Sequence, residues 1–233
     1  MENGLFSTAE FAKWSKDYVL FCHVTTRVEG TKYDNLLSQK KGNSFPYITV
    51  LDDEGNLLQA HRGPRELAAF NSTFHKAQSL NSRLKELDAK AKAGDAEAQR
   101  ALIKERLERG FYSYKQAQEV VAKVKFEGEQ KKTIEGLVTD IRIQEIIDNT
   151  NPRDAKSRIA GGGKLAVILA EGKGPASDAT FENFWVLIMD HAESVSNRKN
   201  FKLGYDALFE KYGSSPRAER FFEGKRKILE GMK

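Results

Sequence analysis

A chain of 233 residues is long enough to bury a core of its own, and we expect it to form two domains. Its 38 Lys and Arg are interspersed with 33 Asp and Glu, and a net charge of +5 without a basic tract argues against nucleic-acid binding. The single cysteine, Cys22, excludes an internal disulfide, a Cys-x-x-Cys pair and a multi-thiolate metal site. We therefore predict no metal and no cofactor. No stretch is apolar enough to span a bilayer.

The N-terminal residues have the pattern of a short helix. Residues 7–10 (STAE) fit a capping box, and Phe6 and Phe11 have the spacing of a hydrophobic staple. We therefore predict a helix from about Thr8 to Lys16. Phe11 and Trp14 are expected to share its buried face.

A strand is predicted directly after this helix. Residues 18–25 (YVLFCHVT) are apolar and rich in β-branched side chains, which is typical of a strand covered on both faces in a parallel sheet. In such a strand Cys22 is predicted to be a buried, unreactive side chain. His23 points to the opposite face, so the two residues form no catalytic pair.

The following segment predicts a short helix and a β-hairpin. The helix is expected over residues 33–39. Pro46 cannot donate a hydrogen bond to a sheet, so we place a strand directly after it, over residues 47–51. The turn-forming residues 52–55 (DDEG) then lead into a returning antiparallel strand over residues 56–60.

Residues 45–63 (FPYITVLDDEGNLLQAHRG) resemble the Phe-Pro-x-x-x-x-Leu-Asp-x-x-Gly stretch of thioredoxin-like proteins. In that family the proline is cis and faces the redox centre. The resemblance therefore implies a cis bond between Phe45 and Pro46, although only about 5–6% of such bonds are cis in folded proteins. It also implies an α/β thioredoxin-like domain over residues 1–78, incomplete because its first strand and dithiol are missing.

Two alignments with that family are possible, and they differ in where its Cys-x-x-Cys motif would fall. Placing it at residues 26–29 leaves too few residues before Pro46 for the helix, strand and loop that normally intervene. In the second alignment, residues 5–27 (LFSTAEFAKWSKDYVLFCHVTTR) are similar to secreted bacterial thioredoxin-like proteins in which the dithiol runs directly into this sequence. Met1 and Glu2 then follow the motif, and the chain is expected to lack a redox dithiol of its own.

The remaining residues, 79–233, are predicted to form an all-α domain of helical hairpins that loosely resembles tetratricopeptide-like repeats. Gly94 and Gly110 are expected to separate helices, and residues 113–116 (SYKQ) form a further capping box. Residues 149–152 (NTNP) mark a clear break between helices.

Two features of this helical part could be mistaken for functional motifs. Residues 161–164 (GGGK) lack the spacing of a phosphate-binding loop and are interpreted as a flexible helix interruption. His191 lies on a helix whose inner face is predicted to carry Phe184 and Ile188, so we interpret it as a structural imidazole. A final helical hairpin is expected around residues 201–232.

The leading function hypothesis is protein or peptide binding without redox chemistry. In thioredoxin-like proteins the backbone beside the cis-proline pairs with an extended substrate chain, and the resemblance assigns this role to Phe45 and Pro46. Open α/β sheets bind ligands where their strands end, so Thr25, Thr26 and Arg27 are further candidate contacts, although a solvated loop is the more frequent reading of such residues.

Two alternatives to this function stay open at this point. The chain is a thiol-disulfide oxidoreductase if its Cys-x-x-Cys lies upstream of Met1, or a helical scaffold if the thioredoxin-like part is vestigial. A second subunit in a homo-oligomer, or the C-terminal part, is expected to cover the incomplete sheet. The protein is periplasmic or secreted if an N-terminal segment has been removed, and cytoplasmic otherwise.

Overall fold

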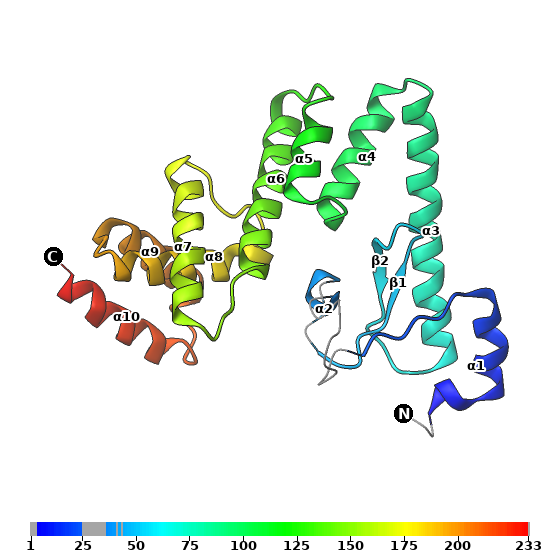
Figure 1. The fold of residues 1–233 in the computed structure, drawn as a ribbon, viewed down its shortest axis with the longest axis horizontal. Helices are drawn as coiled ribbons and strands as arrows, with labels where there is room; N and C mark the ends of the chain where they lie inside the picture. Colours follow the sequence, from blue (N-terminus) through cyan, green and yellow to red (C-terminus); the bar gives the residue numbers. More distant parts are fainter. Residues whose placement is uncertain (1–3, 25–35, 41, 43, 233) are drawn as a thin grey trace. The chain divides into compact units, whose positions relative to one another are not determined.

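The computed structural model describes residues 4–24, 36–40, 42 and 44–232 (Figure 1). The chain is 67% helical and divides into two compact units, Met1–Leu102 and Ile103–Lys233. The domain boundary predicted after residue 78 falls inside a continuous helix, α3 (Leu67–Lys92).

The first unit contains short helices, one hairpin and one long helix. Its elements in chain order are α1 (Ala9–Trp14), α2 (Leu36–Gln39), β1 (Thr49–Leu51), β2 (Leu57–Ala60), α3, and the beginning of α4 (Ala96–Arg109). Within the described ranges, the β-structure is a single two-stranded antiparallel sheet. The prediction of an α/β thioredoxin-like fold is therefore wrong.

The reason for this error lies in residues 18–24, which form neither helix nor strand. A strand in a parallel sheet needs hydrogen-bonding neighbours at its sides and packed layers on its faces. None of the residues that the structure describes pairs with this segment as a strand. A helix satisfies its backbone internally, which is why the helical predictions for the chain fare better than this one.

An aromatic cluster around Phe70 of α3 forms the core of the first unit. The ring of Phe70 is 3% exposed and contacts Phe11 at 6.3 Å and Trp14 at 6.1 Å between ring centroids. Phe6 lies 5.0 Å from Phe11, so the predicted contact between these two rings is confirmed.

The predicted capping box of residues 7–10 is wrong, because the Ser7 hydroxyl donates to the Gly4 carbonyl and does not cap the helix. The N-cap of α1 is Thr8, whose Oγ1 accepts a hydrogen bond from the Phe11 amide at 3.1 Å.

The predicted hairpin is confirmed and lies against α3 (Figure 1). Thr49 pairs with Ala60, and the turn is closed by Asp52, whose Oδ1 accepts hydrogen bonds from the amides of Glu54 and Asn56. Gly55 adopts a φ of +79°, a conformation that favours glycine.

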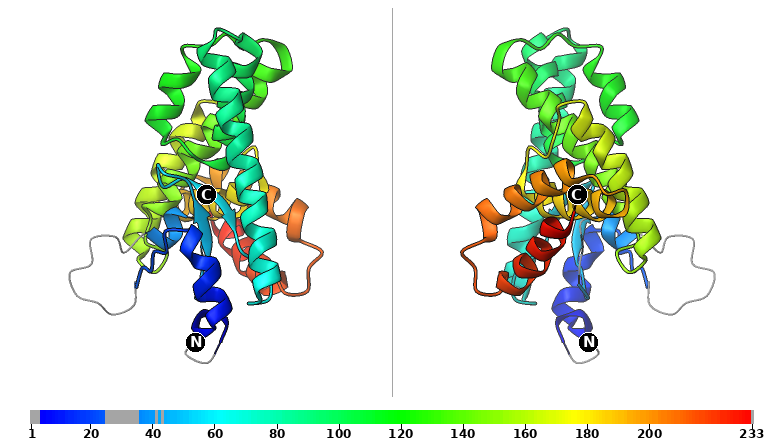
Figure 2. Two further views of the ribbon diagram at one scale, coloured as in Figure 1. Left: turned by 90° about the vertical axis from the view of Figure 1, so that its right-hand side faces the viewer. Right: turned by 90° about the vertical axis from the view of Figure 1, so that its left-hand side faces the viewer.

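The second unit is entirely helical over its described residues. Its elements are the remainder of α4, then α5 (Tyr114–Val121), α6 (Gly128–Asp148), α7 (Ala155–Ala170), α8 (Asp178–Ser194), α9 (Arg198–Tyr212) and α10 (Glu219–Gly231). Figure 2 shows α9 and α10 joined by a short loop as a helical hairpin, as the sequence predicts. The capping box of Ser113 and Gln116 at the start of α5 is also confirmed.

Helix α7 passes without interruption through the three glycines at 161–163, so the predicted flexible interruption is wrong. A Cβ on Gly162 would lie 2.0 Å from the carbonyl oxygen of Leu187 in α8. On the other side of α8, a Cβ on Gly204 of α9 would lie 2.7 Å from Met189 Cγ. The glycines therefore allow three helix backbones to approach closely, and no flexible hinge is needed to explain them.

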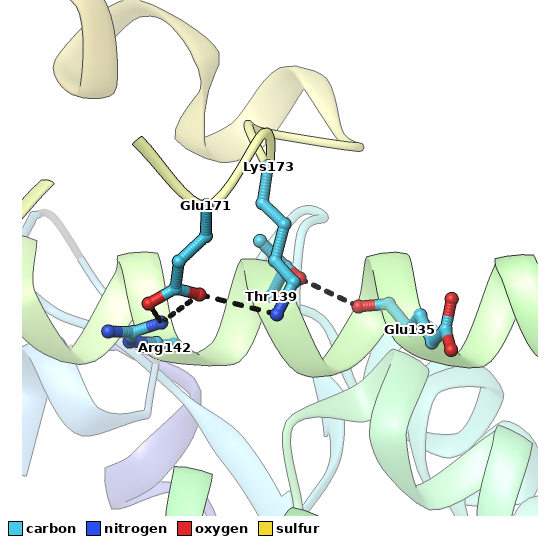
Figure 3. A network of polar contacts seen from close by, with 5 residues as sticks. All are labelled: Glu135, Thr139, Arg142, Glu171 and Lys173. Atoms are coloured by element: carbon cyan, nitrogen blue, oxygen red, sulfur yellow. Dashed lines mark hydrogen bonds and ion pairs between the residues drawn. The ribbon is translucent and has the colours of Figure 1, made fainter. Parts of the chain in front are cut away.

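Hydrogen bonds and ion pairs connect the loop between α7 and α8 to α6. Both carboxylate oxygens of Glu171 accept hydrogen bonds from Arg142 Nη1 at 2.9 Å, and Lys173 Nζ lies 3.3 Å from the same carboxylate (Figure 3). These cations hold the pKa of Glu171 below its ordinary value. Asp140 of α6, 9% exposed, accepts a hydrogen bond from the Ala176 amide at 2.8 Å.

Candidate functional site

The most unusual surface of the first unit is the run that follows α1. We call residues 19–24 the apolar segment; they are Val19, Leu20, Phe21, Cys22, His23 and Val24. Its start is fixed by Tyr18, whose ring centroid lies 4.7 Å from that of Trp14 and 4.2 Å from that of Phe74 on α3. The chain then continues away from this aromatic cluster.

The side chains of the apolar segment are exposed to solvent, except that of His23, which is half-buried. Val19 is 98% exposed, Phe21 is 72% exposed and Leu20 is 59% exposed. Odd-numbered and even-numbered residues are both exposed, and in an extended chain these point to opposite faces. Neither face of the segment is therefore covered by the described part of the protein.

Apart from His23, the backbone of the apolar segment has no backbone partner in the described ranges. Among residues 4–24, 36–40, 42 and 44–232, none forms a backbone–backbone hydrogen bond with a residue of this segment. Extended backbone next to the exposed apolar side chains of Val19, Leu20 and Phe21 is a feature of an edge that accepts another strand. The segment contains no Asp, Glu, Lys or Arg, so a docking chain would desolvate no formal charge here.

The prediction for Cys22 is wrong, because the thiol is exposed rather than buried. The ring of His23 stacks on Phe21, with centroids 6.2 Å apart and an interplanar angle of 6°. This contact is apolar in character and adds to the aromatic surface of the segment.

The sequence-predicted contacts fall into two groups. Phe45 is 63% exposed and Pro46 is exposed directly before β1, and the peptide bond between them is cis, as predicted. Thr25, Thr26 and Arg27 lie outside the described residues, so their predicted role stays a prediction. The structure thus brings Phe45 and Pro46 to the surface. The side chain of the next residue, Tyr47, donates a hydrogen bond from its Oη to the backbone carbonyl of Lys40 at 2.7 Å.

Sequence reasoning missed Val19, Leu20 and Phe21 as surface residues. The absence of charged residues from this run was the available signal. Such a run is either buried or exposed for docking, and the sequence alone favours burial.

Partial burial raises the pKa of the Tyr47 hydroxyl. The hydroxyl therefore stays protonated and able to donate its hydrogen bond to the Lys40 carbonyl.

Other kinds of site find no support in the described chain. No group of His, Cys, Asp and Glu side chains there has the arrangement of a metal site. His191 packs against the α7 glycines, with its Cε1 3.2 Å from a Cβ placed on Gly163, which agrees with a structural imidazole. None of the described helices combines the length and the hydropathy that a membrane span requires.

Comparison with known proteins identifies no relative from which a function could be inferred. The chain matches no protein-family model, no curated protein and no solved structure at a significant level. The resemblance of residues 45–63 to thioredoxin-like proteins is not tested by this result and stays a prediction.

Proposed function

We propose that this chain is a protein-binding module that docks an extended stretch of a partner polypeptide along the apolar segment. The observation that carries the proposal is the exposure of Val19, Phe21 and Val24, at 98%, 72% and 58%, in a segment with no regular secondary structure. A soluble surface rarely keeps several large apolar side chains together in water without a partner.

The backbone argues for a polypeptide as the partner. Main-chain amide and carbonyl groups in residues 19–24 match those of another extended chain, which is the chemistry of strand addition. Side chains on both faces then add affinity, at about 1.5–3 kcal/mol for each large apolar side chain that becomes fully buried. Part of this gain offsets the ordering of both chains, so we expect micromolar rather than nanomolar binding.

The partner stretch is expected to be apolar and uncharged. Because the segment contains no formal charge, it offers nothing to compensate a Lys or Glu that docking would desolvate. Phe45, 63% exposed beside Pro46, is a second contact that we assign to the same partner class. Neither role requires a redox dithiol.

A binding measurement with an unfolded protein tests the proposal. The probe is fluorescently labelled α-lactalbumin that has been reduced and carboxymethylated, which presents extended apolar stretches without thiols. We expect the full chain to raise the anisotropy of this probe, with a dissociation constant on the order of micromolar. Calcium-loaded, folded α-lactalbumin carries the same sequence and is expected not to bind.

Matched variants assign the binding to the segment. The double substitution Val19→Asp and Phe21→Asp places two charges in the docking surface, and we expect affinity to fall at least about tenfold. Val167→Asp changes an equally apolar side chain, 53% exposed on α7, and is expected to leave affinity unchanged. Absence of binding by the native chain, or equal binding by the double variant, would contradict the proposal.

A further inference from the structure

The last helix of the second unit, α10, buries little of its own surface. Among its residues 219–231, all of which the structure describes, the one buried side chain is Phe222. Ile228 and Leu229 pack against the same core but stay half-buried. Helix α8, in contrast, buries six side chains, which are Thr180, Phe184, Leu187, Ile188, Met189 and Ala192. Because most of the stability of a helix comes from the packing of its apolar face, α10 is held by much less than α8.

Gly224 weakens α10 further. It lies inside the helix, where glycine is less favourable than alanine because its backbone loses more freedom on folding. Apart from its chain neighbours and the backbone of its own helix, no described atom lies within 4 Å of a Cβ placed on this residue. Alanine would therefore fit here and strengthen the helix.

A charged contact ties the middle of α10 to the two helices before it. Lys225 Nζ lies 3.4 Å from Glu193 Oε2 and 3.7 Å from Asp190 Oδ1, both on α8. The same ammonium group lies 5.6 Å from the centroid of the Phe201 ring on α9, as a cation–π contact. The Lys225 side chain is 16% exposed, so this contact is largely shielded from water.

Asp190 joins the contact to α7 as well. Its carboxylate, with the side chain 13% exposed, accepts a hydrogen bond from Arg158 Nη2 of α7. Shielding from water makes such charge pairs stronger than exposed ones. Within the described ranges, the ion pairs of Arg226 and Lys227 stay inside α10, so Lys225 alone links this helix to others by charge.

We propose that α10 is a cover that opens and closes as a unit over α9, and that Lys225 is the contact that keeps it closed. Opening breaks the Lys225 contacts at the loop-distal side of residues 213–218 (GSSPRA) and leaves α7, α8 and α9 folded. Segments with few buried contacts open at a lower free energy than the core of the same domain. The opened form exposes Phe201, which is 0% exposed while α10 is in place. This device lies in the second unit, so the inference does not depend on the proposed function.

Native-state hydrogen–deuterium exchange of the full chain, read by mass spectrometry, tests whether α10 opens alone. If it does, its amides should have protection factors at least about tenfold lower than those of α8. Ile168→Val weakens the core cluster between α7 and α8, which stays intact when only α10 opens. This variant should lower the protection of α8 about two- to tenfold and leave that of α10 unchanged.

A matched pair of lysine variants tests the role of Lys225. Lys225→Met keeps an unbranched apolar side chain and removes the charge, and it should lower the protection of α10 at least about threefold. The protection of α8 should fall with it, because global unfolding breaks the same contact. Lys227→Met is the control, because its pair with Glu223 lies within α10 and is exposed, so protection should change about twofold or less.

Gly224→Ala shifts the equilibrium in the opposite direction. It should raise the protection of α10 about fivefold, because the closed helix gains stability relative to the unfolded one. Circular dichroism confirms that each variant is folded. The proposal is overturned if α10 and α8 have equal protection in the native chain or if Ile168→Val lowers both alike. Equal effects of Lys225→Met and Lys227→Met, or no added protection in Gly224→Ala, would also overturn it.

Discussion

One apolar run in each unit shows an opposite outcome for its side chains. In the second unit, Phe184 is fully buried among the side chains of neighbouring helices, whereas in the first unit Phe21 is 72% exposed. Both residues lie in runs that are apolar in the sequence, FENFWVLIM and YVLFCHV. Hydropathy alone therefore does not decide which of these runs becomes core.

Backbone pairing explains why the two runs differ in burial. Helix α8 satisfies its own amides and carbonyls, so it needs only apolar neighbours such as α7 and α9, which lie next to it in the chain. A β-branched run such as residues 18–24 also needs other strands to pair with. Where the described chain supplies none, the same apolar character stays exposed as a surface for a partner.

The largest predicted effect contrasts these two phenylalanines directly. Phe184→Ala should lower the free energy of unfolding by about 3–5 kcal/mol, because it leaves a cavity in a packed core. Phe21→Ala should change it by less than about 0.5 kcal/mol, because the ring is mostly solvated. Urea denaturation followed by circular dichroism measures both. A similar loss in both variants would mean that Phe21 packs in a core of its own.

The next prediction concerns the close packing of α7 against α8 at Gly162. Gly162→Ala should destabilise the protein by about 1–3 kcal/mol, because the new methyl group would meet the Leu187 carbonyl oxygen and force α7 away from α8. Gly163→Ala adds the same methyl group one position later, where it meets only the imidazole of His191 at 3.2 Å.

That neighbouring substitution is the control for Gly162. Alanine is favoured over glycine in a helix by about 1 kcal/mol, and the His191 ring can move by a few tenths of an ångström, so Gly163→Ala should be close to neutral. If thermal unfolding gives equal midpoints for the two variants, close helix contact is not what Gly162 provides.

A smaller effect is expected at the hairpin of β1 and β2, whose strands are joined by a short turn. Gly55 has a φ of +79°, so Gly55→Ala should cost about 1 kcal/mol in unfolding free energy. Gly55→Asn should cost less, since asparagine tolerates this conformation better. Chemical denaturation of the two variants checks the order, and a reversed order would exclude a left-handed turn at this residue.

The smallest effect concerns pH. Arg142 and Lys173 hold the pKa of Glu171 below its ordinary value of 4.5, so the folded state gains stability above that pH and loses it as the pH falls towards the lowered pKa. Glu171→Gln removes this dependence. We expect thermal unfolding at about pH 7 and about pH 3 to differ slightly more for the native chain than for the variant. An identical difference would mean that the ion pair has no net effect.

Much of the local structure could be predicted from residues near each other in the chain. The contact between Phe6 and Phe11, the turn at Asp52 and the capping box of Ser113 and Gln116 all follow from spacings of a few residues. The hairpin could be predicted because its two strands are joined by a turn that the sequence specifies.

The errors arose where the outcome depends on distant partners. Residues 18–24 have the composition of a buried strand, but composition does not show whether neighbouring strands exist. Gly161, Gly162 and Gly163 indicated flexibility in isolation, whereas their role depends on the approach of Leu187 and Thr150. The cis bond between Phe45 and Pro46 could be predicted from a short stretch of sequence, whereas the exposure of Phe21 could not.

Hydrogen–deuterium exchange of the apolar segment is the most direct test of the account. In the free chain, the amides of residues 19–22 and 24 should exchange at close to the rates of an unstructured peptide, because no residue in the described ranges forms a backbone–backbone hydrogen bond with them. Adding unfolded, carboxymethylated α-lactalbumin should slow exchange there and leave α8 unchanged. Strong protection of these amides in the free chain, or no added protection in the presence of the probe, would contradict the account.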